Sequence, residues 1–280
     1  MHTEDSFTTK DGLGLHAQDW LPEGAVRARL ILLHGFGDHS GRYAELADFL
    51  NASGIAVHTY DQRGHGKSPG RRAYINHFDD FLDDLDLYRA HVRDKIGGEP
   101  LFLMGHSMGG MVLTRYAQTR DVPARGLIFS SPFLGFPDDV PQILLKLANV
   151  LSAVAPWLPV GGVDNRGLSR DPAAVAAADN DPLTFHGKVA ARTGAQFFET
   201  IQTADTAYGK ITLPSLVIHG TADRVVPCAG ATKLHAGLGA ADKTLRLFEG
   251  GYHELWNDLD KAEFMGVVLD WMEAYLNGSV

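Results

Sequence analysis

Residues 105–109, which read Gly-His-Ser-Met-Gly, constrain the fold more than any other part of the chain. The apolar run at residues 101–104 is suited to a buried parallel strand, and the spacing of apolar residues at 110–117 is typical of a helix. A Gly-x-Ser-x-Gly pattern between a strand and a helix predicts a sharp turn that exposes the serine hydroxyl above the end of a sheet. Glycine at the flanking positions lets the strand and the helix approach closely. Ser107 is therefore the candidate nucleophile.

Strand-like and helix-like segments alternate over most of the 280 residues. Buried strands are expected at residues 30–33, 55–60, 101–104, 126–129, 215–218 and 244–248, after a hairpin at residues 7–21. Repeated strand–helix units predict a mostly parallel sheet with helices on both faces. From residue 132 to about 213 the alternation stops, and apolar helical runs appear with no clear strand. We therefore expect an α/β fold with a core of residues 1–132 and 213–280 and an inserted helical cap of residues 133–212.

Composition narrows the class of protein. With 45% hydrophobic and 21% charged residues, the chain resembles ordinary globular proteins, and its formal charge of −9 argues against nucleic acid as a partner. The single cysteine, Cys228, excludes an intramolecular disulfide and a cysteine-based metal site. The first residues lack the pattern of a signal peptide, and no stretch approaches the ~20 apolar residues of a membrane span. We expect a cytoplasmic location, with peripheral membrane contact and the oligomeric state left open.

A serine nucleophile needs a histidine base that is itself held by a carboxylate. In folds with this serine turn, the order along the chain is Ser, then Asp or Glu, then His. Asp223 follows the predicted strand at 215–218, and His253 lies in a glycine-containing loop after the strand at 244–248. Of the thirteen histidines, His253 alone is late in the chain, in a loop and downstream of a suitable acid. Asp61, which also follows a strand, is the main alternative to Asp223.

Acyl transfer also needs backbone N–H donors for the developing oxyanion. One donor is expected from the residue after the nucleophile, Met108, and the other from an early loop after a strand. The sequence His-Gly-Phe-Gly at residues 34–37 fits that loop, and Phe36 is the expected donor. No metal site is expected, because the chain has no H-E-x-x-H motif.

The chain resembles the monoacylglycerol lipase family of α/β-hydrolases. The matching segments span nearly the whole chain and are residues 34–43, 61–66, 105–110, 168–170, 181–183, 222–224 and 252–253. The serine turn is shared by many hydrolases, whereas His-Ser-Gly-Arg-Tyr at 39–43 and Asp-Pro-Leu at 181–183 are more specific to this family. The resemblance implies a serine esterase without a cofactor that cleaves glycerol esters of single fatty acids.

The resemblance also implies roles for particular residues. Ser107, Asp223 and His253 would form a catalytic triad, with Phe36 and Met108 as the oxyanion hole.

Substrate-binding roles are expected for Asp38, Arg42, Ala178 and Asp179. Family members often carry Glu at the position of Asp38, and an aromatic residue followed by Asn at the positions of Ala178 and Asp179. We therefore expect a wider or differently polar alcohol pocket, which tolerates alcohols bulkier than glycerol.

Other functions remain open at this point. A broader carboxylesterase or a lysophospholipase would use the same triad, and a peptidase or a C–C bond hydrolase would use similar parts. A ligand receptor on a hydrolase scaffold is the non-enzymatic alternative. The apolar residues between 143 and 154 either pack on the core or divide between an acyl tunnel and a surface that touches membranes or micelles.

Overall fold

The computed structural model describes residues 1–93, 95, 97–137 and 140–277, with the side chains of residues 142 and 144–146 outside that description. Its main sheet has eight strands. In spatial order they are β1 (His2–Thr8), β2 (Gly14–Trp20), β4 (Ile55–Tyr60), β3 (Ala28–Leu33), β5 (Leu101–His106), β6 (Gly126–Ser130), β9 (Ser215–Gly220) and β10 (Lys243–Phe248). The pairs β1–β2 and β2–β4 are antiparallel, and all other pairs are parallel.

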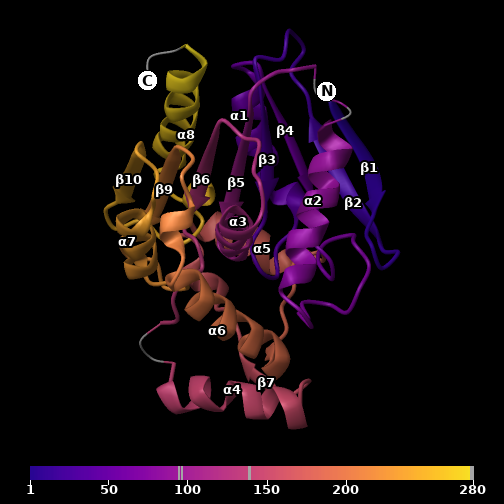
Figure 1. Cartoon of the computed structure of the whole chain (residues 1–280), viewed down its shortest axis with the longest axis vertical. Coiled ribbons are helices and arrows are strands. Elements are labelled where there is room, and N and C mark those ends of the chain that lie inside the picture. The colour runs from indigo at the N-terminus through magenta and orange to yellow at the C-terminus, as the bar shows by residue number, and fades with distance from the viewer. Residues whose placement is uncertain (94, 96, 138–139, 278–280) are drawn as a thin grey trace.

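Helices cover both faces of this sheet (Figure 1). Along β3, Leu30 and Leu32 belong to one buried cluster, and Ile31 and Leu33 to the other, because successive side chains of a strand point to opposite faces. Helices α1 (Ala44–Asn51) and α8 (Lys261–Leu276) pack in the first cluster, and α2 (Asp79–Arg93), α3 (Met108–Thr119) and α7 (Cys228–Gly237) in the second. Burial on both faces explains why the central strands read as continuous apolar runs.

Between β6 and β9 the chain leaves the sheet. It forms α4 (Gln142–Val154), β7 (Pro159–Gly161), α5 (Pro172–Asn180), β8 (Val189–Ala190) and α6 (Ala191–Asp205). Figure 1 shows α6 beside the end of the sheet and α4 farther out. Short 3₁₀ helices lie at η1 (Ser40–Tyr43), η2 (Asn165–Gly167), η3 (Tyr208–Lys210) and η4 (Leu255–Asn257). None of the helices in the described ranges has the length and apolar character that a membrane crossing requires.

Two features of this segment differ from the sequence prediction. Strands β7 and β8 pair as a small antiparallel ribbon, although no strand was expected there; they are too short to produce an alternating pattern. Helix α6 was also not predicted, because polar residues lie on its buried face. Thr193 Oγ1 accepts a hydrogen bond from the Ile75 N–H at 3.0 Å, and Gln196 Oε1 accepts one from the Phe78 N–H at 2.8 Å. These bonds join α6 to the chain between β4 and α2.

Candidate active site

The serine turn between β5 and α3 holds Ser107 in a rarely populated backbone conformation, with φ 52° and ψ −116°. The close approach of its neighbours requires glycine. A Cβ atom on Gly105 would lie 2.3 Å from the carbonyl oxygen of Gly109, and one on Gly109 would lie 2.3 Å from the carbonyl oxygen of Leu33. The turn therefore places Ser107 immediately before the first residue of α3 and directly beside the end of β3.

The loops that follow β9 and β10 bring Asp223 and His253 together. Nδ1 of His253 lies 2.7 Å from Oδ2 of Asp223, and both side chains are almost fully buried. Burial opposes the charged imidazolium, but the Asp223 carboxylate and its hydrogen bond outweigh this effect and raise the pKa of His253. The contact orients Nδ1–H toward the carboxylate and leaves Nε2 as the basic nitrogen.

Backbone donors hold the second oxygen of the Asp223 carboxylate. The N–H groups of Val225 and Val226 donate to Oδ1 at 2.8 and 2.9 Å. Burial disfavours the carboxylate, yet the imidazole groups of His253 and His219 hold the pKa of Asp223 well below its usual range. Asp223 is therefore a fixed anion at neutral pH.

Asp61, the alternative acid, has a different set of partners. Its carboxylate accepts hydrogen bonds from the Ser40 N–H at 2.8 Å, the Ser40 hydroxyl at 2.5 Å and the Lys67 N–H at 2.7 Å. These bonds fix the loop that follows β4. The structure pairs His253 with Asp223 and assigns Asp61 to loop structure.

The loop after β3 places Phe36 beside Ser107 in the lining of one cavity. A Cβ atom on Gly35 would lie 3.3 Å from Cβ of Ser107, so the loop presses against the serine turn. His34 fixes this loop, since its Nδ1–H donates to the Gly35 carbonyl at 2.7 Å and its Nε2 accepts from the Gln62 N–H at 2.9 Å. Met108 begins α3, where the first N–H groups have no acceptor within the helix.

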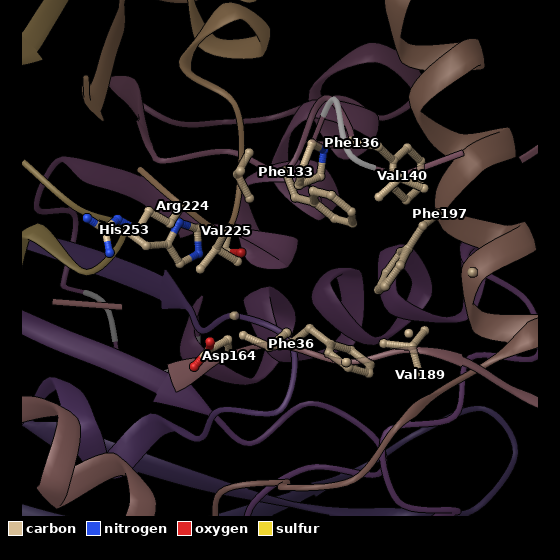
Figure 2. A pocket seen from close by; sticks show the side chains of 18 of the residues that line it. Phe36, Phe133, Phe136, Val140, Asp164, Val189, Phe197, Arg224, Val225 and His253 are labelled. Carbon is tan, nitrogen blue, oxygen red and sulfur yellow. The ribbon is translucent and has the colours of Figure 1, made fainter. Parts of the chain in front are cut away.

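The cavity has a volume of about 380 Å³ and a mixed lining. Figure 2 shows His253 and Arg224 at one end, Phe197 and Val189 at the other, and the ring of Phe36 between them. Helix α4 contributes Ala148 and Leu151 to the lining, and α6 contributes Gly194 and Phe197. The lining is therefore polar beside Ser107 and apolar beneath the segment between β6 and β9.

Asp38 and Arg42 belong to a buried ion-pair network. Arg42 donates to both Glu254 oxygens, at 2.7 and 2.6 Å, and to Asp38 Oδ1 at 3.1 Å. The Tyr43 hydroxyl donates to Asp38 Oδ2 at 2.9 Å. Burial disfavours ionisation of Asp38, but Arg42, together with His34 and His39, outweighs this effect and lowers the pKa of this carboxyl. Asp38 and Glu254 line the main cavity, whereas Arg42 lines an adjoining space of about 40 Å³.

The structure separates Ala178 and Asp179 from the site. Ala178 is fully buried within α5, and Asp179 is exposed and accepts a hydrogen bond from Asn165 Nδ2 at 2.7 Å. Neither is among the described residues that line either cavity. Neither position therefore borders the space where the alcohol pocket was expected, because α5 turns Ala178 toward packing and Asp179 toward solvent.

Sequence reasoning missed several residues of the site. Glu254, the partner of Arg42, directly follows His253, and its N–H donates to the carbonyl of Leu168 at 2.8 Å. His219, which lies four residues before Asp223, contacts the Asp223 carboxylate. The aromatic wall of Phe36, Phe133 and Phe197 joins residues distant in sequence, with ring centroids 5.4 Å apart for Phe36–Phe197 and 5.1 Å for Phe133–Phe197. Only Glu254 and His219 could have been found from the sequence, because they lie next to His253 and four residues before Asp223.

Comparison with known proteins places this site in a family. The family model described as "Serine aminopeptidase, S33" (Hydrolase_4) matches residues 24–260. The monoacylglycerol lipase of Mycolicibacterium smegmatis is 31% identical over 98% of this chain and 98% of its own length. The monoglyceride lipase of Rattus norvegicus is 35% identical over 89% of this chain and 82% of its own length. The crystal structure of the monoacylglycerol lipase of Paleococcus ferrophilus superposes with a TM-score of 0.81 at 33% identity, covering 98% of this chain and 99% of that one.

These similarities extend over both the sheet and the segment between β6 and β9. They confirm the predicted α/β-hydrolase fold, with its mostly parallel sheet and flanking helices. The chain therefore belongs to the monoacylglycerol lipase family of α/β-hydrolases, within the wider group that the Hydrolase_4 model describes.

Proposed function

We propose that the protein hydrolyses monoacylglycerols to a fatty acid and glycerol through an acyl-enzyme on Ser107. The observation that carries this proposal is a single cavity that joins Ser107 and His253 to an apolar channel. An ester of one fatty acid fits such a cavity with its carbonyl at Ser107 and its hydrocarbon chain toward Phe197. The family relatives named as lipases of monoacylglycerols support this substrate.

In the proposed mechanism, Ser107 Oγ attacks the ester carbonyl carbon while its proton passes to Nε2 of His253. Asp223 holds the imidazole and stabilises the imidazolium. The N–H groups of Phe36 and Met108 donate to the oxyanion. The intermediate collapses with loss of glycerol, whose oxygen takes the proton from His253. Water, deprotonated by His253, then attacks the acyl-enzyme to form a second tetrahedral intermediate. When this intermediate collapses, the fatty acid leaves and the proton passes from His253 to Ser107 Oγ.

The polar end of the cavity is proposed to bind the glycerol part of the substrate. Asp38 and Glu254 line the cavity there and can accept hydrogen bonds from hydroxyl groups. Arg42 acts through these two carboxylates, because its guanidinium is bonded to both. Alcohol recognition therefore uses carboxylates whose charge Arg42 partly offsets, which weakens their attraction for cations relative to neutral hydroxyl donors.

The same feature disfavours an aminopeptidase, although the family model is described by that activity. Recognition of a free α-ammonium group requires an uncompensated carboxylate. The carboxylates in the described lining are Asp38, Asp164 and Glu254, and each is bonded to an arginine. Arg42 is shared by Asp38 and Glu254, so its one positive charge offsets part of the charge of these two carboxylates and weakens their attraction for an amino terminus.

Residues 133–212 are proposed to act as a cap whose outer surface contacts lipid. On α4, Ile143, Leu147, Val150 and Val154 are 45–69% exposed, whereas Ala148 and Leu151 line the cavity. One helix thus presents apolar side chains both inward and outward, which is typical of a surface that rests on a membrane or micelle. Leu144 and Leu145, which the sequence also suggested, have side chains outside the described part of the structure.

A matched pair of variants tests this membrane contact. Leu147→Glu should weaken binding to phosphatidylcholine vesicles without changing hydrolysis of short soluble esters. Leu247→Glu is the control, because Leu247 is similarly exposed, at 40% against 45% for Leu147, but lies on β10. Equal vesicle binding by the two variants would contradict the proposed lipid-facing surface.

Activity itself is tested with a substrate panel of monoacylglycerols, diacylglycerols, lysophospholipids and p-nitrophenyl esters. Ser107→Ala should lose turnover by a factor on the order of 10⁶ and lose labelling by a fluorophosphonate probe. Ser6→Ala, at an exposed serine of β1, should behave as wild type. Substantial turnover by Ser107→Ala would refute the serine mechanism. Equal or faster hydrolysis of lysophospholipids would replace the proposed substrate, and a protein that is both inactive and unlabelled would favour the receptor alternative.

A further inference from the structure

A second histidine contacts the carboxylate oxygen that binds His253. His219 lies in β9, and its side chain is fully buried. Its Nε2 is 3.1 Å from Oδ2 of Asp223 and 3.1 Å from the carbonyl oxygen of Val226. Both neighbours are acceptors when Asp223 is ionised, so Nε2 must carry the proton.

The other ring nitrogen of His219 supports the same assignment. Nδ1 is buried and has no hydrogen-bond partner within the described residues. A buried N–H without an acceptor is costly, whereas a bare nitrogen lone pair avoids a stranded proton. His219 is therefore the tautomer protonated at Nε2, whose N–H donates to the Val226 carbonyl and lies 3.1 Å from Oδ2 of Asp223.

This contact completes the surroundings of the Asp223 carboxylate. Oδ1 accepts from the N–H groups of Val225 and Val226, while Oδ2 accepts from Nδ1 of His253 at 2.7 Å and faces Nε2 of His219 at 3.1 Å. Without His219, Oδ2 would face a single donor. The Asp223 carboxylate would then be freer to turn, and more of its negative charge would act on His253.

We propose that His219 is a positioning residue of this site: its Nε2–H holds Oδ2 of Asp223 in place against His253 and takes up part of the carboxylate's charge. This inference rests on the proposed catalytic roles of Ser107, Asp223 and His253. His219 touches Asp223 and acts on the base through it. A purely structural role would consist of filling space at the end of β9.

The two roles differ in their effect on the pH profile. Removing the Nε2–H dipole leaves more negative charge beside His253, which stabilises the imidazolium. The acid limb of kcat/KM should then move to higher pH by roughly half a unit to one unit, the effect of one ordinary hydrogen bond. The other groups that act on His253 are Asp38, Glu254 and His106, and the substitutions below leave all three unchanged.

Two variants separate positioning from packing. His219→Phe retains an aromatic ring without a donor, and His219→Gln retains an amide N–H near the position of Nε2. With a soluble p-nitrophenyl ester, His219→Phe should show the raised acid limb and a lower kcat, and His219→Gln should restore the wild-type limb. An unchanged limb in folded His219→Phe, or a shift to lower pH, would overturn the proposal.

A measurement that needs no activity completes the test. Imidazole ¹⁵N NMR of the unsubstituted protein should show that the neutral form of His219 carries its proton on Nε2 and not on Nδ1. Protonation at Nδ1 would overturn the proposal even if His219→Phe fails to fold. Because NMR reports the titration of His253 directly, also in Ser107→Ala, failure of the His219 inference is distinguishable from failure of the proposed esterase function.

Discussion

Arg42 and Glu254 form a bidentate ion pair, with donor–acceptor distances of 2.7 and 2.6 Å. The pair joins the segment that follows β3 to the loop that holds His253. Arg42 also reaches Asp38, so one guanidinium joins the loop of Phe36 to the loop of His253. The two loops are separated by more than two hundred residues in sequence. Their relative position therefore depends on a buried charge network as well as on the sheet.

Removing Arg42 should destabilise the fold strongly. Arg42→Met leaves Asp38 and Glu254 buried without their counter-charge, which should cost about 3–5 kcal/mol of unfolding free energy. Arg27→Met is the control, because Arg27 and Glu273 form an exposed pair, with side-chain exposures of 42% and 33%, and should cost about 1 kcal/mol or less. Urea unfolding measures both. Similar losses for the two variants would show that the buried network does not matter.

A methyl group at Gly109 should damage the site through the backbone. In Gly109→Ala the new Cβ would lie 2.3 Å from the Leu33 carbonyl oxygen, so the serine turn and the loop of Phe36 must separate. We expect a loss of about 1–3 kcal/mol in stability together with a large fall in kcat. Gly266→Ala on α8 meets no atom within 4 Å and should instead stabilise the helix by about 0.5–1 kcal/mol. Wild-type kcat in Gly109→Ala would contradict this steric argument.

The pH dependence of hydrolysis should follow His253, which must be neutral to act as a base. Because the pKa of His253 is raised by Asp223, kcat/KM should fall as the pH drops through a value above the usual ~6.5 of histidine. Asp223→Asn removes the negative charge, so the acid limb should move to lower pH while kcat falls by a factor on the order of 10⁴. Asp61→Asn should leave the acid limb in place. A shift produced by Asp61→Asn alone would make Asp61 the acid.

The apolar channel should set the preferred acyl length. Gly194 lines the cavity on α6, and Gly194→Leu should shorten the channel. Each methylene that can no longer be buried should reduce binding by about 0.8 kcal/mol, so kcat/KM for long-chain monoacylglycerols should fall while short-chain esters are spared. Gln202→Leu, at an exposed position of the same helix, should leave the chain-length profile unchanged. Equal losses for short and long chains would place the acyl group elsewhere.

Much of the core was predictable from local patterns. The central strands are buried on both faces and read as apolar runs, and Gly105 reflects a close contact with Gly109, four residues away in sequence. The order Ser, Asp, His led to the prediction of Asp223 and His253, and the structure places these two side chains in hydrogen-bond contact. Such features can be predicted from the sequence because strand periodicity and tight turns depend on only a few consecutive residues.

Other features depended on contacts between distant segments. Arg42 was expected to touch substrate, but its donors serve Asp38 and Glu254, and Ala178 lies outside the cavity because of how α5 packs. Helix α6 was hidden by the polar residues that bind the chain before α2. The fold class and the candidate nucleophile, base and acid could be predicted from the amino-acid sequence, since these follow from local pattern and chain order. Only the tertiary structure decided which buried charges are paired and which side chains face the cavity, because partners brought together by folding carry no periodic signal in the sequence.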